Sequence, residues 1–229
     1  INYENKIKKL GGIDLQILGI GRTGHIGFNE PGSHLNSHTR TITLDHLTRY
    51  DAISAFQGIE NVPRKAITMG IQSILNAKRI LLMAWGTNKA GIIQKAVEGQ
   101  ISDKIPTTYL QNHKNTTLIL DGESSSELTR IKTPWLVGNC NWNDDNSLKA
   151  IVWLRKKVNK SILKLTDEDY NQNGMSDLLV LSGSSYDINI EMFNRLQHSI
   201  TGWPGGKPKS DDTNRPERKS PEKKRVLIF

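Results

Sequence analysis

The sequence has 229 residues, a formal net charge of +8, 6% aromatic residues and a single cysteine, Cys140. One cysteine excludes a disulfide framework within the chain, and no apolar run approaches the length of a membrane span. No charged-then-apolar leader is present, so we expect a cytoplasmic protein, and the positive charge favours an anionic partner without identifying it.

Strands and helices alternate along the first 130 residues. Short apolar runs predict three strands, at 13–19, 79–85 and 116–120. Helical spacing of apolar side chains predicts helices over 45–57 and 89–97. In the first of these helices, Leu47, Tyr50 and Phe56 share one face. The alternation predicts an α/β fold with a doubly wound, mostly parallel sheet.

The character of the chain changes in its second half. Residues 131–206 contain an amphipathic helix, predicted over 147–158, and we expect them to form an ordered connector. Residues 207–224 are rich in proline and basic side chains, which is typical of a solvated linker. The alternative is a nucleic-acid-binding arm. No aromatic residue lies between Trp203 and Phe229 to stack on bases, so we expect no nucleic-acid partner.

The run LGIGRTGHIGFNEP, residues 18–31, carries most of the functional information. It places His25, Asn29 and Glu30 within six positions, among four glycines and directly after the first predicted strand. Open α/β sheets bind ligands at the carboxyl ends of their strands. Glycine lets the backbone approach a ligand, and histidine transfers protons near neutral pH. The pattern therefore indicates an active-site loop.

Two other interpretations of this loop are a dinucleotide-binding turn and a purely structural turn. Three of the glycines match the G-x-G-x-x-G pattern of dinucleotide-binding folds: Gly19, Gly21 and Gly24. That pattern requires a helix to begin at the third glycine, and Gly27 and Pro31 do not suit a helix interior. A purely structural turn around a core histidine is the second alternative. The carboxylate of Glu30, five residues after His25, favours a site instead.

The segment GHIGFNEPGS, residues 24–33, resembles the signature loop of glucosamine-6-phosphate deaminases. These enzymes convert glucosamine 6-phosphate into fructose 6-phosphate and ammonia, whereas the related 6-phosphogluconolactonases continue as GHTASLFP. Four further segments follow in family order: 39–44, 63–70, 86–90 and 96–99. The resemblance covers residues 1–130. It implies a Rossmann-like domain whose N-terminal half precedes this sequence, a homo-oligomer, a small-molecule sugar phosphate as ligand, and neither cofactor, metal ion nor membrane partner.

The same resemblance implies roles for individual residues. His25 would open the sugar ring as a general acid and base, and Glu30 would hold the imidazole and favour its charged form. Gly24 and Asn29 would bind substrate, and Lys89 would bind the phosphate at a turn that leads into a helix. The carboxylate base for C2 and the phosphate-binding loop belong to family segments that precede residue 1.

Two departures from the family pattern affect these expectations. Arg22 and Thr23 stand where many members have an asparagine and an aspartate. A second phosphate-binding arginine is replaced by Ser54, and Arg49 and Arg64 are candidates to compensate for it. Losing one bidentate contact would weaken phosphate binding by about 1.5–3 kcal/mol.

The second half resembles the connector of certain bacterial fusions. In these, a deaminase-like domain precedes a deacetylase-like domain of the LmbE/PIG-L type, and residues 225–229 would be the first strand of that domain, truncated here. Two functions remain open. The first is an amino-sugar-phosphate isomerase and deaminase, inactive as this fragment alone. The second is a non-catalytic sugar-phosphate-binding module that regulates the deacetylase partner.

Overall fold

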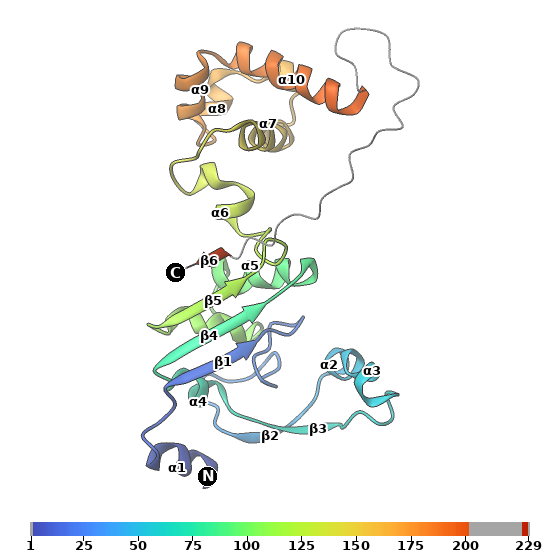
Figure 1. Cartoon of the computed structure of the whole chain (residues 1–229), viewed down its shortest axis with the longest axis vertical. Coiled ribbons are helices and arrows are strands. Elements are labelled where there is room, and N and C mark those ends of the chain that lie inside the picture. Colours follow the sequence, from blue (N-terminus) through green and yellow to red (C-terminus); the bar gives the residue numbers. More distant parts are fainter. Residues whose placement is uncertain (1, 202–225, 229) are drawn as a thin grey trace. The chain divides into compact units, whose positions relative to one another are not determined.

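The computed structural model describes residues 2–201 and 226–228. Residues 2–128 together with 226–228 belong to the first of two units, and residues 129–201 belong to the second. The first unit is built on a four-stranded sheet in the order β1-β4-β5-β6 (Figure 1). Its strands are β1 (Leu15–Gly19), β4 (Arg79–Ala84), β5 (Thr116–Leu120) and β6 (Val226–Ile228). The first three are parallel and β6 is antiparallel to β5. The predicted α/β fold with a mostly parallel sheet is confirmed.

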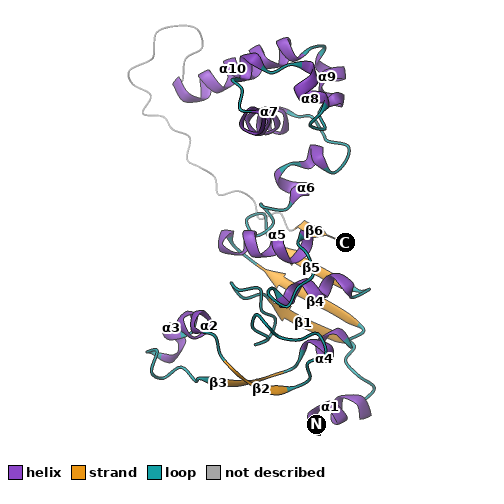
Figure 2. Cartoon of the chain, turned by 180° about the vertical axis from the view of Figure 1, so that it is seen from behind, coloured by secondary structure: helices purple, strands orange, loops and turns teal. Residues whose placement is uncertain are grey.

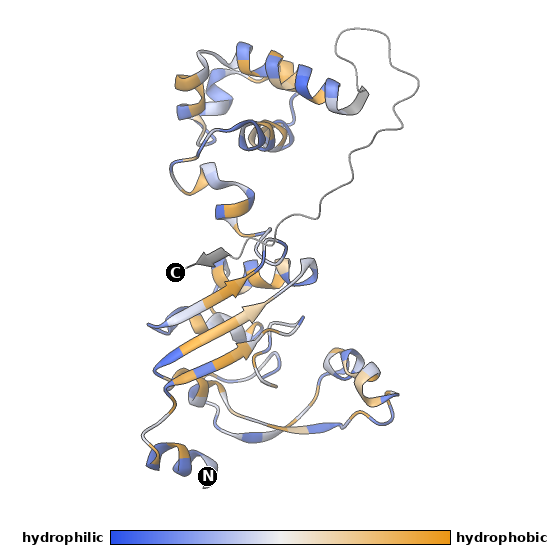
Figure 3. Cartoon of the chain, in the orientation of Figure 1, coloured by the Kyte–Doolittle hydropathy of each residue, from blue (hydrophilic) through white to orange (hydrophobic). Residues whose placement is uncertain are grey.

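The core of this unit lies on one face of the sheet. Alternate residues of β4 point into it, and Ile80 and Leu82 have no exposed surface. The covering elements are α4 (Ile71–Leu75), α5 (Ala90–Glu98) and the 3₁₀ segment η2 (Pro106–Asn112) (Figure 2). On β1, Leu15 and Ile17 point to the opposite face and are about half exposed. Most of β1, β4 and β5 is hydrophobic (Figure 3), as expected for strands that bury one or both faces.

A two-stranded ribbon extends from this sheet (Figure 1). Strand β2 (Arg40–Thr43) pairs antiparallel with β3 (Lys65–Thr68). Helices α2 (His46–Asp51) and α3 (Ile53–Phe56) connect the two strands. Neither strand was predicted from the sequence. A run of only four residues gives too little alternation to distinguish a strand from a loop.

The single helix predicted over 45–57 is wrong in its continuity. Two short helices occupy the segment and are separated at Ala52, and α3 ends where Gln57 takes a left-handed conformation with φ of 57°. Asp45 caps the N-terminus of α2, and its carboxylate accepts a hydrogen bond from the backbone N–H of Leu47. The expected apolar face is also not buried, because Leu47 and Tyr50 are 46% and 59% exposed.

The second unit is helical. Its described elements are α6 (Thr129–Lys132), η3 (Pro134–Leu136), α7 (Asp144–Val158), η4 (Ile162–Lys164), α8 (Asp167–Asn171), α9 (Ser176–Ser182) and α10 (Ser185–Thr201). The indole of Trp135 stacks on Trp142 with ring centroids 6.2 Å apart and meets the edge of Trp153 at 5.7 Å. Tyr170 and Met175 are fully buried in the same core. The region expected to be a connector therefore has a hydrophobic core of its own.

Helix α7 begins three residues before its predicted start. The side chain of Asn143 accepts a hydrogen bond from the backbone N–H of Asn146 and so caps the first turn. The expected linker at 207–224 lies outside the described residues. Residues 226–228 pair with β5, and their expected place at the start of a deacetylase-like domain stays a prediction.

Candidate active site

The loop that follows β1 folds back on itself. The backbone N–H of Gly21 donates to the carbonyl of His25 at 3.0 Å, and that of Gly24 donates to the carbonyl of Gly21 at 3.0 Å. Thr107 donates both its N–H and its hydroxyl to the carbonyl of Gly24. No helix begins at Gly24, so this loop lacks the strand-turn-helix geometry that a dinucleotide fingerprint requires.

Two glycines of the loop have no room for a side chain. A Cβ atom on Gly21 would overlap the imidazole of His25, because the ring lies directly against the Gly21 backbone. A Cβ atom on Gly24 would overlap the side chain of Ile105, and the φ of Gly24 is +81°. Gly21 therefore sets the position of the His25 ring, and Gly24 sets the turn that carries it.

His25 and Glu30 form the centre of the site. Nδ1 of His25 lies 3.0 Å from Oε2 of Glu30, and the two side chains are 17% and 13% exposed. The hydroxyl of Thr23 lies 3.1 Å from the same nitrogen. The hydroxyl of Thr48, on α2, donates to Oε1 of Glu30 at 2.5 Å. Bonding at Nδ1 fixes the ring orientation and leaves Nε2 as the nitrogen that can transfer a proton to a ligand.

Asn29 supports the loop from inside. Its side chain is fully buried, and its amide donates to the carbonyls of Ile26 and Met69 at 2.9 and 2.8 Å. Its side-chain oxygen accepts a hydrogen bond from Arg40 at 2.9 Å. These bonds give Asn29 a structural role beneath the site. A direct contact of Asn29 with substrate stays a prediction, and this geometry gives it no support.

Gly24 is in a similar position. Gly24 is buried, and both its N–H and its carbonyl form hydrogen bonds within the protein. Its place in the predicted substrate-binding set therefore rests on the shape that it gives to the loop.

Lys89 reaches the base of the site loop. It lies at the end of a 3₁₀ turn, η1 (Thr87–Lys89), that leads from β4 into α5. Its ammonium group donates to the carbonyl of Ile20 at 2.8 Å, across 69 positions of sequence. Burial lowers the pKa of Lys89 below its ordinary value, while the Asp51 carboxylate raises this pKa and the Arg22 guanidinium lowers it. Lys89 is thus a partly desolvated cation beside the loop of His25.

The structure places the three residues discussed for the second phosphate contact in different environments. Ser54 is exposed on α3. Arg49 donates to the carbonyls of Ile59 and Val62 at 3.0 and 3.3 Å, so its guanidinium holds the segment after α3. Arg64 is exposed just before β3. The guanidinium of Arg49 is therefore already bonded to backbone carbonyls.

Several functional residues at this edge of the sheet were not predicted from the sequence. Thr48 was not recognised. Arg22 makes a bidentate pair with Asp51 of α2, at 2.6 and 3.0 Å. Asp121 follows β5, and its pKa is lowered first by hydrogen bonding with Ser124, whose backbone N–H donates to the carboxylate, and then by the backbone N–H of Gly86. An Asp-Gly pair directly after a strand was the available signal for Asp121.

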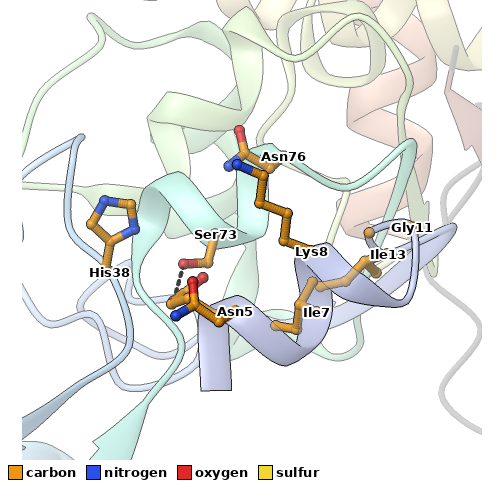
Figure 4. A pocket seen from close by; sticks show the side chains of 10 residues that line it. Asn5, Ile7, Lys8, Gly11, Ile13, His38, Ser73 and Asn76 are labelled. Atoms are coloured by element: carbon orange, nitrogen blue, oxygen red, sulfur yellow. Dashed lines mark hydrogen bonds between the residues drawn. The ribbon is translucent and has the colours of Figure 1, made fainter. Parts of the chain in front are cut away.

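Two described cavities lie in the first unit. One, of about 430 Å³, adjoins Glu30 and is also lined by Ser33 and Arg40. Another, of about 570 Å³, lies between α1 (Asn2–Lys9) and α4 (Figure 4). In the second cavity, Glu4 accepts a hydrogen bond of 2.6 Å from Ser73. This cavity is not lined by His25, so it is separate from the candidate site.

The described part of the chain holds no group of three or more histidine, cysteine or acidic side chains suited to a metal ion. Among these residues, no helix has the length and hydropathy needed to cross a bilayer.

Comparison with known proteins gives a consistent result. A family described as glucosamine-6-phosphate isomerases/6-phosphogluconolactonase matches residues 1–119. A glucosamine-6-phosphate deaminase-like protein of Bacteroides thetaiotaomicron is 57% identical over 227 residues, which are 99% of this chain and 34% of that protein. Glucosamine-6-phosphate deaminase of Clostridium novyi is 52% identical over 127 residues, which are 56% of this chain and 53% of that enzyme.

A solved structure agrees with these sequences. That of a monomeric glucosamine-6-phosphate deaminase superimposes with a TM-score of 0.54 and 47% identity, over 55% of this chain and 52% of that one. The chain thus spans a third to about half of the relatives it matches. On the family match over residues 1–119 and the His25–Glu30 loop within it, this chain belongs to the family of glucosamine-6-phosphate isomerases and 6-phosphogluconolactonases.

Proposed function

We propose that this chain is part of an amino-sugar-phosphate isomerase and deaminase, which converts glucosamine 6-phosphate and water into fructose 6-phosphate and ammonia. The observation that carries the proposal is the pair of His25 and Glu30, held 3.0 Å apart at the carboxyl end of β1. Lys89, brought to the same loop, gives the site a cation for the phosphate. Amino-sugar catabolism in the cytoplasm, by a homo-oligomer, belongs to the same proposal.

The first chemical step is the opening of the sugar ring. Nε2 of His25 gives a proton to the ring oxygen and takes one from the anomeric hydroxyl, so the histidine ends the step as it began. A carboxylate base, expected in the sequence before residue 1, then moves a proton from C2 to C1. Water adds at C2, and the amino group leaves as ammonia.

The test is a pair of measurements on the full-length protein. His25→Gln is expected to lower kcat for ammonia release by roughly 10²-fold, because general acid–base catalysis is lost. Binding of glucosamine 6-phosphate, measured by calorimetry, is expected to stay close to that of the wild type. His46→Gln, an exposed histidine on α2, is the matched control and keeps full turnover. An unchanged kcat in His25→Gln would remove His25 from the mechanism.

A second candidate function is a non-catalytic sugar-phosphate-binding module that regulates a deacetylase partner. The uncharged Ser54, in place of a phosphate-binding arginine, favours it. Binding of glucosamine 6-phosphate without ammonia release by the wild type would select this module. Residues 1–229 alone are expected to release no ammonia under either function, because the C2 base is expected outside them.

A further inference from the structure

Two cations meet at the base of the site loop. Arg22 pairs with Asp51 through two hydrogen bonds, Nη2 to Oδ1 at 2.6 Å and Nε to Oδ2 at 3.0 Å. Lys89 donates to the carbonyl of Ile20, two residues before Arg22. The guanidinium and the ammonium group are near enough to act on each other electrostatically, and both act with Asp51. The carboxylate of Asp51 therefore interacts with both positive charges, those of Arg22 and Lys89.

Lys89 and Arg22 differ in burial and in the kind of partner that each one bonds. Lys89 is partly buried, and its bond goes to a neutral carbonyl, so its charge is not neutralised there. The side chains of Arg22 and Asp51 are 44% and 49% exposed. Exposed ion pairs contribute little to stability, so Arg22 can exchange Asp51 for another anion at low cost. A planar guanidinium bonds two phosphate oxygens as readily as two carboxylate oxygens.

We propose that Arg22 supplies the second cation of the phosphate site. When the sugar binds, the guanidinium of Arg22 separates from Asp51 and binds the phosphate group together with Lys89. This inference rests on the proposed function, since it assigns a residue to the same site. It also answers the question raised by Ser54. Arg49 is bonded to backbone carbonyls and Arg64 is exposed before β3, whereas Arg22 already lies in the loop of His25.

Asp51 gives the inference a sharp test, because two roles of the ion pair predict opposite results. If Arg22 binds phosphate, Arg22→Met raises the KM for glucosamine 6-phosphate roughly 10-fold or more, with kcat little changed. Asp51→Asn frees Arg22 and removes a negative charge, so it lowers the same KM. If the ion pair only holds the loop against α2, both variants remove that contact. The two variants then change KM in the same direction as each other, and likewise kcat.

The measurements are made on the full-length protein, with Arg79→Met as the matched control. Arg79 is an exposed arginine at the amino end of β4, the far end of the sheet from the loop. Competition by inorganic phosphate is expected to weaken in Arg22→Met and to strengthen in Asp51→Asn. Parallel effects of the two variants, or an unchanged KM in Arg22→Met, would overturn the inference.

Failure of the proposed function looks different from failure of this inference. If the wild type releases no ammonia, calorimetry with glucosamine 6-phosphate and with glucosamine still decides the role of Arg22. Loss of phosphate-dependent affinity in Arg22→Met supports the inference in that case, and equal affinities in variant and wild type reject it.

Discussion

Thr48 donates a hydrogen bond of 2.5 Å to Oε1 of Glu30, while the other oxygen of Glu30 faces Nδ1 of His25 at 3.0 Å. The carboxylate is therefore held from two sides, by a helix of the ribbon and by its own loop. A carboxylate held in this way fixes the plane of the imidazole and the direction of Nε2. Thr48 acts through Glu30, so it is a positioning residue.

Replacing Thr48 by valine keeps its shape and removes the hydroxyl. Glu30 then loses a charge-assisted hydrogen bond worth about 1.5–3 kcal/mol, and we expect kcat to fall roughly tenfold with little change in KM. Steady-state ammonia release by the full-length protein measures both. Thr48→Ser retains the hydroxyl and is expected to recover most of the rate, and Thr41→Val, on an exposed position of β2, serves as control. Equal rates for Thr48→Val and the wild type would exclude this role.

Gly21 offers a test of the position of His25 itself. The φ of Gly21 is not in the left-handed region, so alanine suits its backbone, but a Cβ there would overlap the imidazole. We expect Gly21→Ala to fold with near-wild-type thermal stability and to lose about 10²-fold in kcat, because the displaced ring no longer meets the substrate correctly.

Gly19→Ala is the matched control for Gly21→Ala. A Cβ on Gly19 meets no atom within 4 Å, so the same substitution two residues away is expected to keep full activity. Thermal unfolding of both variants separates a local effect from loss of the fold. If both alanines reduce kcat alike, the contact between Gly21 and His25 does not limit catalysis.

The sequence predicted the parts of this fold that depend on neighbouring residues. The three parallel strands are continuous apolar runs, and the pairing of His25 with Glu30 needs only five residues of loop. What it did not predict depends on tertiary contacts. Thr48 reaches Glu30 across 18 positions, and the burial of Asn29 depends on Met69, 40 positions away.

Helix continuity failed for a related reason. The apolar spacing of residues 45–57 suits one helix. In the structure, however, Leu47, Tyr50 and Phe56 are exposed, so no buried apolar face keeps α2 and α3 in one continuous helix. Periodicity identified a helical segment correctly and could not report the break at Ala52.

Lys89→Ala tests the phosphate contact directly. Removing the ammonium group is expected to weaken binding of glucosamine 6-phosphate by about 2–3 kcal/mol, because a charged hydrogen bond in a partly closed site is lost. Binding of unphosphorylated glucosamine is expected to stay unchanged. Calorimetry on the full-length protein compares the two ligands, with Lys95→Ala on α5 as control. Equal losses for both sugars would show that Lys89 does not contact the phosphate.

The pH dependence of binding follows from the lowered pKa of Lys89. Lys89 binds phosphate only when charged, and burial makes it lose its proton at a lower pH than an exposed lysine. As the pH is raised, the KM for glucosamine 6-phosphate is therefore expected to begin increasing at a pH below the ordinary lysine pKa. Lys89→Arg keeps its charge over this range and is expected to flatten the alkaline limb. The same limb in Lys89→Arg would assign the titration to another group.

Trp135 tests whether the helical unit is held by its own core. Its side chain is 3% exposed and contacts the rings of Trp142 and Trp153. Trp135→Ala is expected to destabilise this unit by about 3–5 kcal/mol, as large aromatic truncations in cores do. Hydrogen exchange should then lose protection in α7 and α8, while β4 and β5 keep theirs because their buried residues belong to a separate cluster. Tyr186→Ala, at a residue 70% exposed on α10, removes an aromatic ring from the same unit without opening its core and is expected to leave both patterns unchanged. If β4 and β5 lose as much protection as α7 and α8 in Trp135→Ala, the two units unfold as one.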